Sequence, residues 1–312
     1  MGRFFRGPRL GGDAVLARLD SATGGADAYT FSYGDSPDGL HVHAYFVDEP
    51  VPHILYCTYG LSRVASSQRV AGTQTELTMR VPDADFPHQW PADQLARMAR
   101  RIRRTGHEIA PGHHMATPNG PVPAYVFVTD PVLGIIDGPT GLIRFTYAVG
   151  LADDDFERML RWDPIKFAGV VGDAVPLGLT DPNRRPISDN PEIRTRLDGA
   201  AEGEGSSISA MLAEYLAVDE GGRVDLDPEA ARALLRGARY RLRFGRPFAL
   251  VRGDAWFLCD PAAARTEFAD DHIVVAAGRE LANELLAVLD DVPGSYPLRT
   301  APVTITVIDP QR

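Results

Sequence analysis

Three strand-like segments follow one another early in the chain without a helical pattern between them. They cover residues 40–47 (LHVHAYFV), 53–60 (HILYCTYG) and 75–81 (TELTMRV), which run apolar or alternate with a period of two. The connections are the turn-forming residues 48–50 and a serine-rich stretch at 62–68. Parallel strands need a long crossover, usually a helix, so this series predicts a sheet without regular strand–helix–strand repeats.

The third segment also alternates in polarity. Apolar residues occupy every second position and polar residues the positions between, so the pattern predicts a strand with one solvated face. The residues expected to be buried are Leu77, Met79 and Val81, and those expected in solvent are Glu76, Thr78 and Arg80.

A helix is predicted directly after this strand. Pro91 suits the first helical position, and Gly106 can adopt the left-handed conformation that ends a helix. The apolar stripe between them consists of Leu95, Met98, Ala99 and Ile102. The last turns carry an arginine cluster of Arg100, Arg101, Arg103 and Arg104. Because cations are favourable at this end of the helix dipole, we interpret the cluster as a solvated helix end, and anion binding is the less favoured alternative.

The middle of the chain predicts further strands at 124–129 and 142–150. A helix is expected to begin at the aspartates 153–155, which are expected to remain in water beside the helix dipole. Residues 181–206 are rich in Gly, Pro and Asp and predict a loop with at most a short helix near 193–197.

A second unit is predicted to begin after residues 221–222. Its expected helices cover residues 228–236 and 279–290, and its expected strands 238–244, 247–252, 255–259, 272–276 and 303–308. Strands and helices do not alternate strictly, so the predicted class is α+β, or mixed-sheet α/β, in two domains covering residues 1–220 and 221–312.

Charge and cysteine content exclude several classes of partner. The net charge of −10 argues against nucleic acid and anionic membranes, which require a cationic face. Cys57 and Cys259 lie far apart in apolar runs and are expected to be buried thiols, as in a reducing cytoplasm. The sequence contains no apolar run long enough to span a bilayer, so a cytoplasmic protein is expected.

Histidines provide the most prominent candidate catalytic cluster in the sequence. His41 and His43 share one strand face, and His113 follows Gly112 in a loop, so the three could hold zinc in a metal-dependent hydrolase. There is no H-E-x-x-H motif or paired C-x-x-C, and G-L-S-R-V at 60–64 lacks the last glycine of a nucleophile elbow. Surface or hydrogen-bonded histidines are therefore favoured, with no metal and no cofactor.

Several longer segments occur in a fixed order, which is more specific than any one of them. ELTMRVP, PHQWPADQLARMAR, APGHHM, VFVTDPVLGIIDGPTGLIRFTYAVGLADDDFERML, LTDPNRRPI and GSSISAML resemble, in this order, the N-terminal domain of the suppressor of fused family. ALLRGARYRLRFGRPFALVRGDAWFL and the final VTITVI are similar to its C-terminal domain. The resemblance spans about residues 30–309, but the long disordered insert of animal members is missing and the N-terminal extension differs.

The resemblance implies a non-enzymatic binding protein with a protein or peptide partner. Animal members sequester a transcription factor by clamping an extended peptide between their two domains, and bacterial members are proposed to be immunity proteins that neutralise polymorphic toxins. The implied binding mode is β-augmentation, in which a strand edge supplies main-chain hydrogen bonds. A metal-dependent hydrolase and a structural or oligomeric subunit remain as alternatives.

Four residues are implied as partner-binding by the same resemblance. Asp130, in V-T-D-P, matches the family aspartate that engages a histidine of the bound peptide. Its alternative role is an Asx-turn cap before Pro131. Tyr125, Phe127 and Ser207, the last at the start of segment 207–217, are expected at the site from their positions alone.

Overall fold

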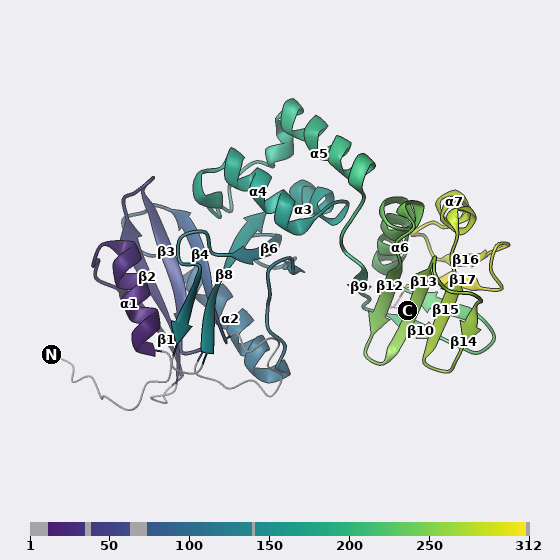
Figure 1. Cartoon of the computed structure of the whole chain (residues 1–312), viewed down its shortest axis with the longest axis horizontal. Helices are drawn as coiled ribbons and strands as arrows, with labels where there is room; N and C mark the ends of the chain where they lie inside the picture. Colours follow the sequence, from purple (N-terminus) through teal and green to yellow (C-terminus); the bar gives the residue numbers. More distant parts are fainter. Residues whose placement is uncertain (1–11, 35–38, 63–73, 139–140, 310–312) are drawn as a thin grey trace. The chain divides into compact units, whose positions relative to one another are not determined.

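The computed structural model describes residues 12–34, 39–62, 74–138 and 141–309 (Figure 1). The serine-rich connection predicted at 62–68 lies outside the described residues after Ser62.

The chain folds into two compact units. Unit 1 comprises Met1–Phe156 and Pro164–Asp189, and unit 2 comprises Glu157–Asp163 and Asn190–Arg312. The sequence analysis places the division after residue 220. In the structure residues 190–220 group with unit 2, because the two strands within them pair with strands of that unit.

Unit 1 is built on an eight-stranded mixed sheet. The order is β1-β2-β3-β4-β8-β6-β5, with β7 also paired to β8, and β4 runs parallel to β8 while the other pairs are antiparallel. The strands are β1 (Tyr29–Tyr33), β2 (Leu40–Val47), β3 (His53–Tyr59), β4 (Gln74–Pro82), β5 (His114–Ala116), β6 (Ala124–Thr129), β7 (Ile135–Gly138) and β8 (Gly141–Leu151). The mixed sheet confirms the predicted fold class.

Helices cover both faces of this sheet (Figure 1). Helix α1 (Gly12–Thr23) packs Val15 and Leu19 on one face, and α2 (Gln89–Thr105) packs its apolar stripe on the other. The predicted wet face of β4 is therefore wrong: Glu76, Thr78 and Arg80 are at most 1% exposed. A polar alternation predicts a solvated face only where no second layer covers it.

Helix α2 has the predicted buried apolar face and the predicted C-terminal cap. Leu95, Met98, Ala99 and Ile102 are all buried. Gly106 has φ 70° and donates its N–H to the Ile102 carbonyl, as predicted for a left-handed cap. The helix begins at Gln89, two residues before the predicted Pro91, and Trp90 is half-buried beside the core.

Two further helices and a buried aspartate follow the sheet in the chain. Helix α3 (Asp153–Leu160) begins at the predicted aspartates in unit 1 and continues into the segment Glu157–Asp163 of unit 2, and α4 (Pro164–Ala174) belongs to unit 1. Asp155 is fully buried rather than in water, because it accepts hydrogen bonds from the Arg184 guanidinium and the Ile187 N–H.

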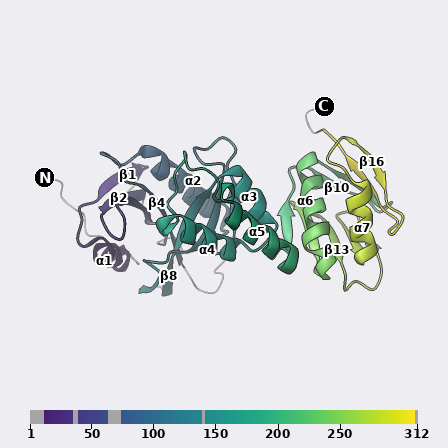
Figure 2. The same cartoon turned by 90° about the horizontal axis from the view of Figure 1, so that it is seen from above.

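Unit 2 contains two sheets around one apolar core. One has the order β10-β11-β17-β16 and the other β14-β15-β13-β12-β9, and helices α6 and α7 lie side by side in both views (Figure 1, Figure 2). The elements are α5 (Pro191–Glu204), β9 (Ala210–Leu212), β10 (Leu216–Val218), β11 (Arg223–Leu226), α6 (Pro228–Tyr240), β12 (Phe248–Arg252), β13 (Ala255–Asp260), β14 (Glu267–Phe268), β15 (His272–Ala276), α7 (Arg279–Val288), β16 (Gly294–Pro297) and β17 (Thr304–Val307).

Two predictions for unit 2 are wrong. Residues 191–204 form the helix α5 rather than a loop, because the Asn190 side chain caps its first turn by accepting the Glu192 and Ile193 N–H groups. Residues 238–244 are the end of α6 and a short 3-10 turn rather than a strand, because the buried stripe of α6 continues to Ala238.

Candidate functional site

Asp130 follows directly after β6, inside unit 1. Its N–H donates to the Phe145 carbonyl on β8 at 2.8 Å, so the chain remains attached to the sheet up to this residue. Arg80 extends from β4, the strand on the other side of β8. The topology thus brings together a cation and an anion that are 50 residues apart in sequence.

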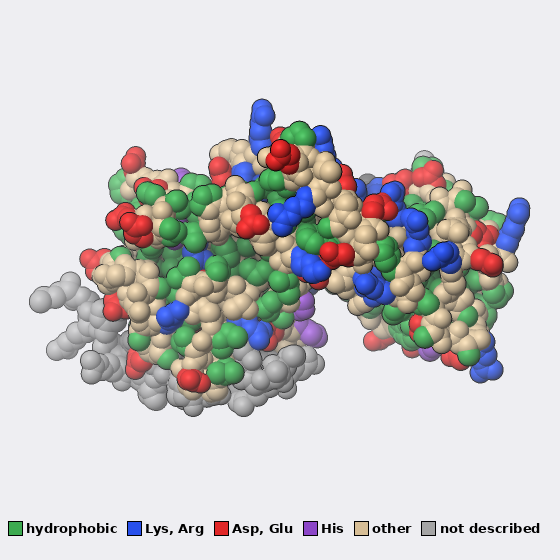
Figure 3. Space-filling model, turned by 45° about the horizontal axis from the view of Figure 1, so that its top comes forward, with side chains coloured by type: hydrophobic (Ala, Val, Ile, Leu, Met, Phe, Trp, Pro, Cys, Tyr) green, Lys and Arg blue, Asp and Glu red, His purple; other side chains and the backbone are tan. Residues whose placement is uncertain are grey.

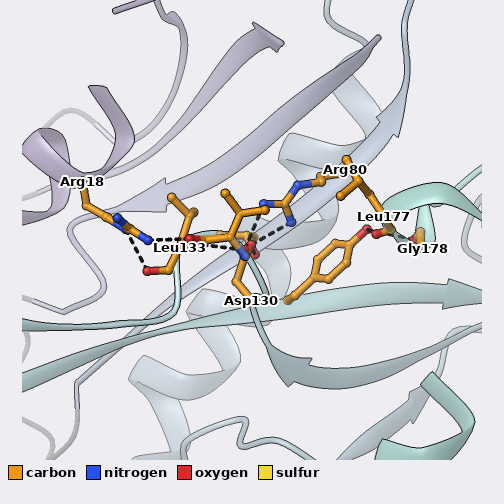
Figure 4. Close-up of polar contacts among 9 residues, drawn as sticks. Arg18, Arg80, Asp130, Leu133, Leu177 and Gly178 are labelled. Carbon is orange, nitrogen blue, oxygen red and sulfur yellow. Dashed lines mark hydrogen bonds and ion pairs between the residues drawn. The ribbon is translucent and has the colours of Figure 1, made fainter. Parts of the chain in front are cut away.

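Arg80 and Asp130 form a bidentate, fully buried ion pair (Figure 4). Arg80 Nη1 donates to Asp130 Oδ2 at 2.8 Å, and Nη2 donates to Oδ1 at 2.9 Å. Thr78 Oγ1 donates a third bond to Oδ2 at 2.7 Å. A buried pair of this kind costs about 3–5 kcal/mol when one partner alone is removed, because the other charge is left uncompensated.

The same carboxylate holds the turn that follows β6. Asp130 Oδ1 accepts the Val132 and Leu133 N–H groups, both at 2.9 Å. The Leu133 carbonyl in turn accepts a hydrogen bond from Arg18 Nε on α1 (Figure 4). The Asx-turn that the sequence offers as the alternative role of Asp130 is therefore present, and both carboxylate oxygens are engaged within the chain.

The ion pair controls the titration of Asp130. Burial alone would raise the pKa of this carboxyl, but the Arg80 guanidinium and the hydrogen bonds from Arg80, Leu133 and Thr78 outweigh burial and hold the pKa below its usual value. Burial would lower the pKa of Arg80, and Asp130 instead keeps it raised. Both groups are therefore charged at neutral pH.

A strained turn lies next to this pair. Leu177 has φ 56°, which costs a residue with a Cβ about 1–2 kcal/mol. Tyr147 Oη contacts the carbonyl oxygens of Leu177 at 2.9 Å and Gly178 at 2.8 Å, and the Arg80 guanidinium carbon lies 4.9 Å from the centre of the Tyr147 ring. The turn at Leu177 is thus coupled to the ion pair through one tyrosine (Figure 4).

Tyr125 and Phe127 are core residues of β6. Both side chains are 0% exposed and lie in the cluster that packs on α2. Their participation in partner binding stays a prediction, and in this structure it would be through the position of the β6 backbone, since no side-chain surface is open.

Ser207 lies in unit 2, with an exposed side chain. Its N–H donates to the Trp162 carbonyl at 3.1 Å. The neighbouring Ser206 is buried and fixes the segment: its Oγ donates to the Leu160 carbonyl at 3.0 Å, and its carbonyl accepts Arg241 Nη1 at 2.8 Å. Ser207 is thus an open position on a firmly anchored segment.

The strand that follows, β9, forms an edge of the five-stranded sheet. The Ser209 carbonyl accepts the Ala249 N–H, and the Ala213 N–H donates to the Val251 carbonyl, both at 2.9 Å and both toward β12. Because the two polar groups of a trans peptide point in opposite directions, the Ala210 N–H and the Leu212 carbonyl point away from β12.

The free side of β9 also exposes apolar surface. Ala210 is exposed and the Leu212 side chain is 74% exposed, whereas Met211 between them packs against the core. Unpaired edges of this kind are templates for an added strand. The sequence analysis named the segment but missed Ala210 and Leu212, because the three apolar residues A-M-L do not indicate which of them face solvent.

The histidines do not form a metal centre in the described residues. His41 Nδ1 hydrogen-bonds to Ser32 and His43 Nδ1 to Thr30, both on β1, while the His113 ring accepts the Ala110 N–H. Burial lowers the pKa of His43 to about 4, so it is neutral at physiological pH. Across residues 12–34, 39–62, 74–138 and 141–309, no group of three His, Cys, Asp or Glu could hold a metal ion.

The predicted site residues therefore fall into two places. Tyr125, Phe127 and Asp130 lie together on and after β6 in unit 1, and Ser207 lies in unit 2. Within the described chain, no helix is both long and apolar enough to cross a membrane.

Comparison with known proteins identifies proteins of similar sequence pattern and fold. Residues 36–185 match the family model described as Suppressor of fused protein (SUFU). The crystal structure of Drosophila Suppressor of Fused superposes with a TM-score of 0.75 at 17% identity, covering 98% of this chain and 100% of that chain. A chain in a Sufu–Fu complex superposes with a TM-score of 0.54 at 20% identity, covering 61% of this chain and 98% of that chain. No curated protein matches the sequence.

Proposed function

Because the chain is a suppressor of fused-like protein, we propose that it is a non-enzymatic protein-binding module that takes up an extended segment of a partner by β-augmentation. The observation that carries the proposal is the open edge of β9, with an outward N–H at Ala210, an outward carbonyl at Leu212 and an exposed leucine side chain. The similar protein in the Sufu–Fu complex supports a protein as the partner.

Each unit has an edge strand that could serve this purpose. In unit 1 we propose β5, which pairs with β6 alone among the described strands, and in unit 2 we propose β9. The family resemblance implies a clamp formed by both domains. Asp130, Tyr125 and Phe127 would then act by fixing β6, which carries β5, and Ser207 by direct contact.

The partner that we propose is a toxin, neutralised by this chain as an immunity protein in the cytoplasm. The net charge of −10 would speed association with a basic partner by electrostatic steering. Both cysteines are buried and free, in keeping with a reducing compartment. The test is co-expression with a toxin encoded beside the gene: survival of the host supports the immunity role, and unchanged killing contradicts it while leaving other protein partners open.

Partner binding itself is tested at Ala210. The immobilised chain is used to capture a partner from its host, and the purified partner is then titrated against variants. Ala210→Pro removes the outward N–H at an edge position that tolerates proline, and we expect at least tenfold weaker binding. Ala210→Thr keeps this N–H and should bind like the parent chain. Equal affinity of the two variants would contradict β-augmentation at β9, and capture of no protein would contradict the binding function.

A further inference from the structure

The arginines of α2, which are Arg97 and the arginine cluster, differ in the contacts that their side chains make. The Arg100 guanidinium lies 5.3 Å from the centre of the Tyr33 ring, and Arg103 Nη2 donates to the Gly60 carbonyl at 2.9 Å. Arg97 donates to the neutral side chain of Gln94, and the Arg101 side chain forms no hydrogen bond, ion pair or ring contact with the described residues. The favourable interaction of cations with the C-terminal end of the helix dipole therefore accounts for only some of these arginines.

Arg97 and Arg101 line one side of a groove in unit 1. The groove lies between α2 and the edge strand β5, has a volume of about 330 Å³ and includes Met98 and Met115. Met98 is 2% exposed and Met115 is half-buried, so both thioethers form part of the walls. Methionine adapts its shape to different ligands and is common at peptide-binding surfaces.

The far wall of the groove is a turn that is fixed before any ligand binds. The Thr117 N–H donates to the Pro123 carbonyl at 2.6 Å, and the Gly120 N–H donates to the Thr117 carbonyl at 2.8 Å. A Cβ at Gly120 would lie 3.1 Å from the Thr117 carbonyl oxygen, so a larger residue would require the turn to shift slightly. A preformed wall lowers the entropy lost on binding.

Arg97 and Arg101 repel each other unless an anion binds between them. They are one helical turn apart on the same face, and like charges at this spacing destabilise a helix. On the face of the molecule in Figure 3, acidic and basic side chains are interspersed, and some exposed arginines pair with carboxylates, as Arg232 does with Glu229. Neither Arg97 nor Arg101 forms an ion pair with a described residue.

A buried donor without a partner lies next to the groove. Tyr125 is opposite Met115 in the β5–β6 register, and its buried hydroxyl has no hydrogen-bond partner. The positive charge of Arg97 acts on this hydroxyl, partly opposing the rise in its pKa that burial causes. The region therefore carries two cations without an ion pair among the described residues and one unused donor, and the groove lining includes no carboxylate.

We propose that this groove binds an acidic, extended segment of the protein partner, with two glutamates at positions i and i+2 that pair with Arg97 and Arg101. Residues one turn apart on a helix are about 6 Å apart, and side chains at i and i+2 of an extended chain are about 6.6 Å apart, so the two spacings match. Glutamate provides a carboxylate for bidentate pairing and a methylene stem that packs on Met98 and Met115. This inference rests on the proposed partner binding and names the chemistry of one contacting segment.

The test uses the full-length chain and a defined probe, so that it does not depend on finding the partner. The probe is an acetylated and amidated Ala-Glu-Ala-Glu-Ala peptide, titrated at low salt while the methyl signals of the methionines are followed by NMR. We expect saturable shifts of the Met98 and Met115 signals that disappear in about 0.5 M salt, where charge pairs are screened. The matched peptide Ala-Gln-Ala-Gln-Ala should leave these signals unchanged.

Two variants distinguish peptide binding in the groove from nonspecific attraction to the positive charge of α2. Arg101→Gln should weaken binding of the glutamate peptide at least fivefold, and Arg104→Gln, an exposed position on α2 outside the groove, should leave it within twofold. The proposal is overturned by absent shifts at Met98 and Met115, by equal effects of the two variants, or by a short single-stranded DNA that moves the same signals more strongly than the peptide. None of these results affects the Ala210 test, so the two proposals fail separately.

Discussion

The two places where the sequence predicts partner contacts differ in how much of their polar surface the chain itself uses. The Asp130 carboxylate accepts bonds from Thr78, Arg80 and the turn after β6, and the residue is 1% exposed. The β9 edge directs an N–H and a carbonyl away from its sheet and exposes Leu212. The first place is built for stability and the second is available for binding, so substitutions should affect stability at one and affinity at the other.

The largest expected effect is loss of stability on neutralising Asp130. Asp130→Asn leaves the Arg80 cation buried without a counter-charge, and we expect the free energy of unfolding to fall by about 3–5 kcal/mol. The measurement is denaturant unfolding followed by circular dichroism.

Glu76→Gln is the matched control for this substitution. Glu76 is also fully buried, but its carboxylate accepts bonds only from neutral groups of Thr58, Gly60 and Ser62. Burial raises the pKa of Glu76, so its charge is already unfavourable, and loss of the charge should change stability by about 1 kcal/mol or less. Similar losses for the two variants would show that the Arg80 pairing is not what sets the cost.

The effect of Asp130→Asn should depend on pH. The pKa of Asp130 is lower in the folded chain than the unfolded value of about 3.9, so the ion pair contributes fully above about pH 4 and its contribution disappears as the pH falls through the folded pKa. Unfolding free energies of the parent and the variant, measured from neutral pH down to acid, should therefore converge at low pH. A difference that stays constant over this range would contradict the assigned charge state.

A smaller loss is expected within the anchored segment of unit 2. Ser206→Ala leaves the Leu160 carbonyl and the Ile208 N–H without the hydroxyl that both contact, at a cost of about 1–3 kcal/mol. Ser207→Ala removes only an exposed hydroxyl and should stay within about 0.5 kcal/mol. Thermal unfolding of both variants checks this order, and equal shifts would mean that the exposed position is not free of internal contacts.

The smallest change in stability is expected at the open edge itself. Leu212→Ser removes an exposed side chain and should leave the unfolding free energy within about 0.5 kcal/mol. Affinity for the captured partner should nevertheless fall by about tenfold, because a buried leucine contact is worth about 1.5–3 kcal/mol. Calorimetric titration of the purified partner decides this, and undiminished affinity would place the contact elsewhere.

The periodicity of apolar residues in the sequence predicts those strands and helices that bury a continuous apolar face. Residues 40–47, 124–129 and 272–276 are strands with the predicted bounds, and the predicted stripe and cap of α2 are present. Helix α5 was missed because only Leu197 and Ala201 of its residues are buried, so it has almost no stripe, and the cap at Asn190 was the remaining signal.

The candidate site was less predictable, because it depends on contacts between distant segments. Asp130 was identified through a family resemblance, and its turn-capping role follows from V-T-D-P itself. Its partner Arg80 was assigned to solvent, since an alternating strand looks the same whether or not a second layer covers its polar face. The open edge of β9 depends on which strand pairs with β12, which local sequence does not determine.

Inward-facing and outward-facing residues lie close together within the short segment 206–212. Ser206 and Met211 face inward and keep the segment in place, whereas Ser207, Ala210 and Leu212 face outward and support nothing behind them. Replacements at the outward positions can therefore accumulate without unfolding the chain. Substitutions at these three outward positions could therefore change which partner segment binds, while the fold that positions the segment stays the same.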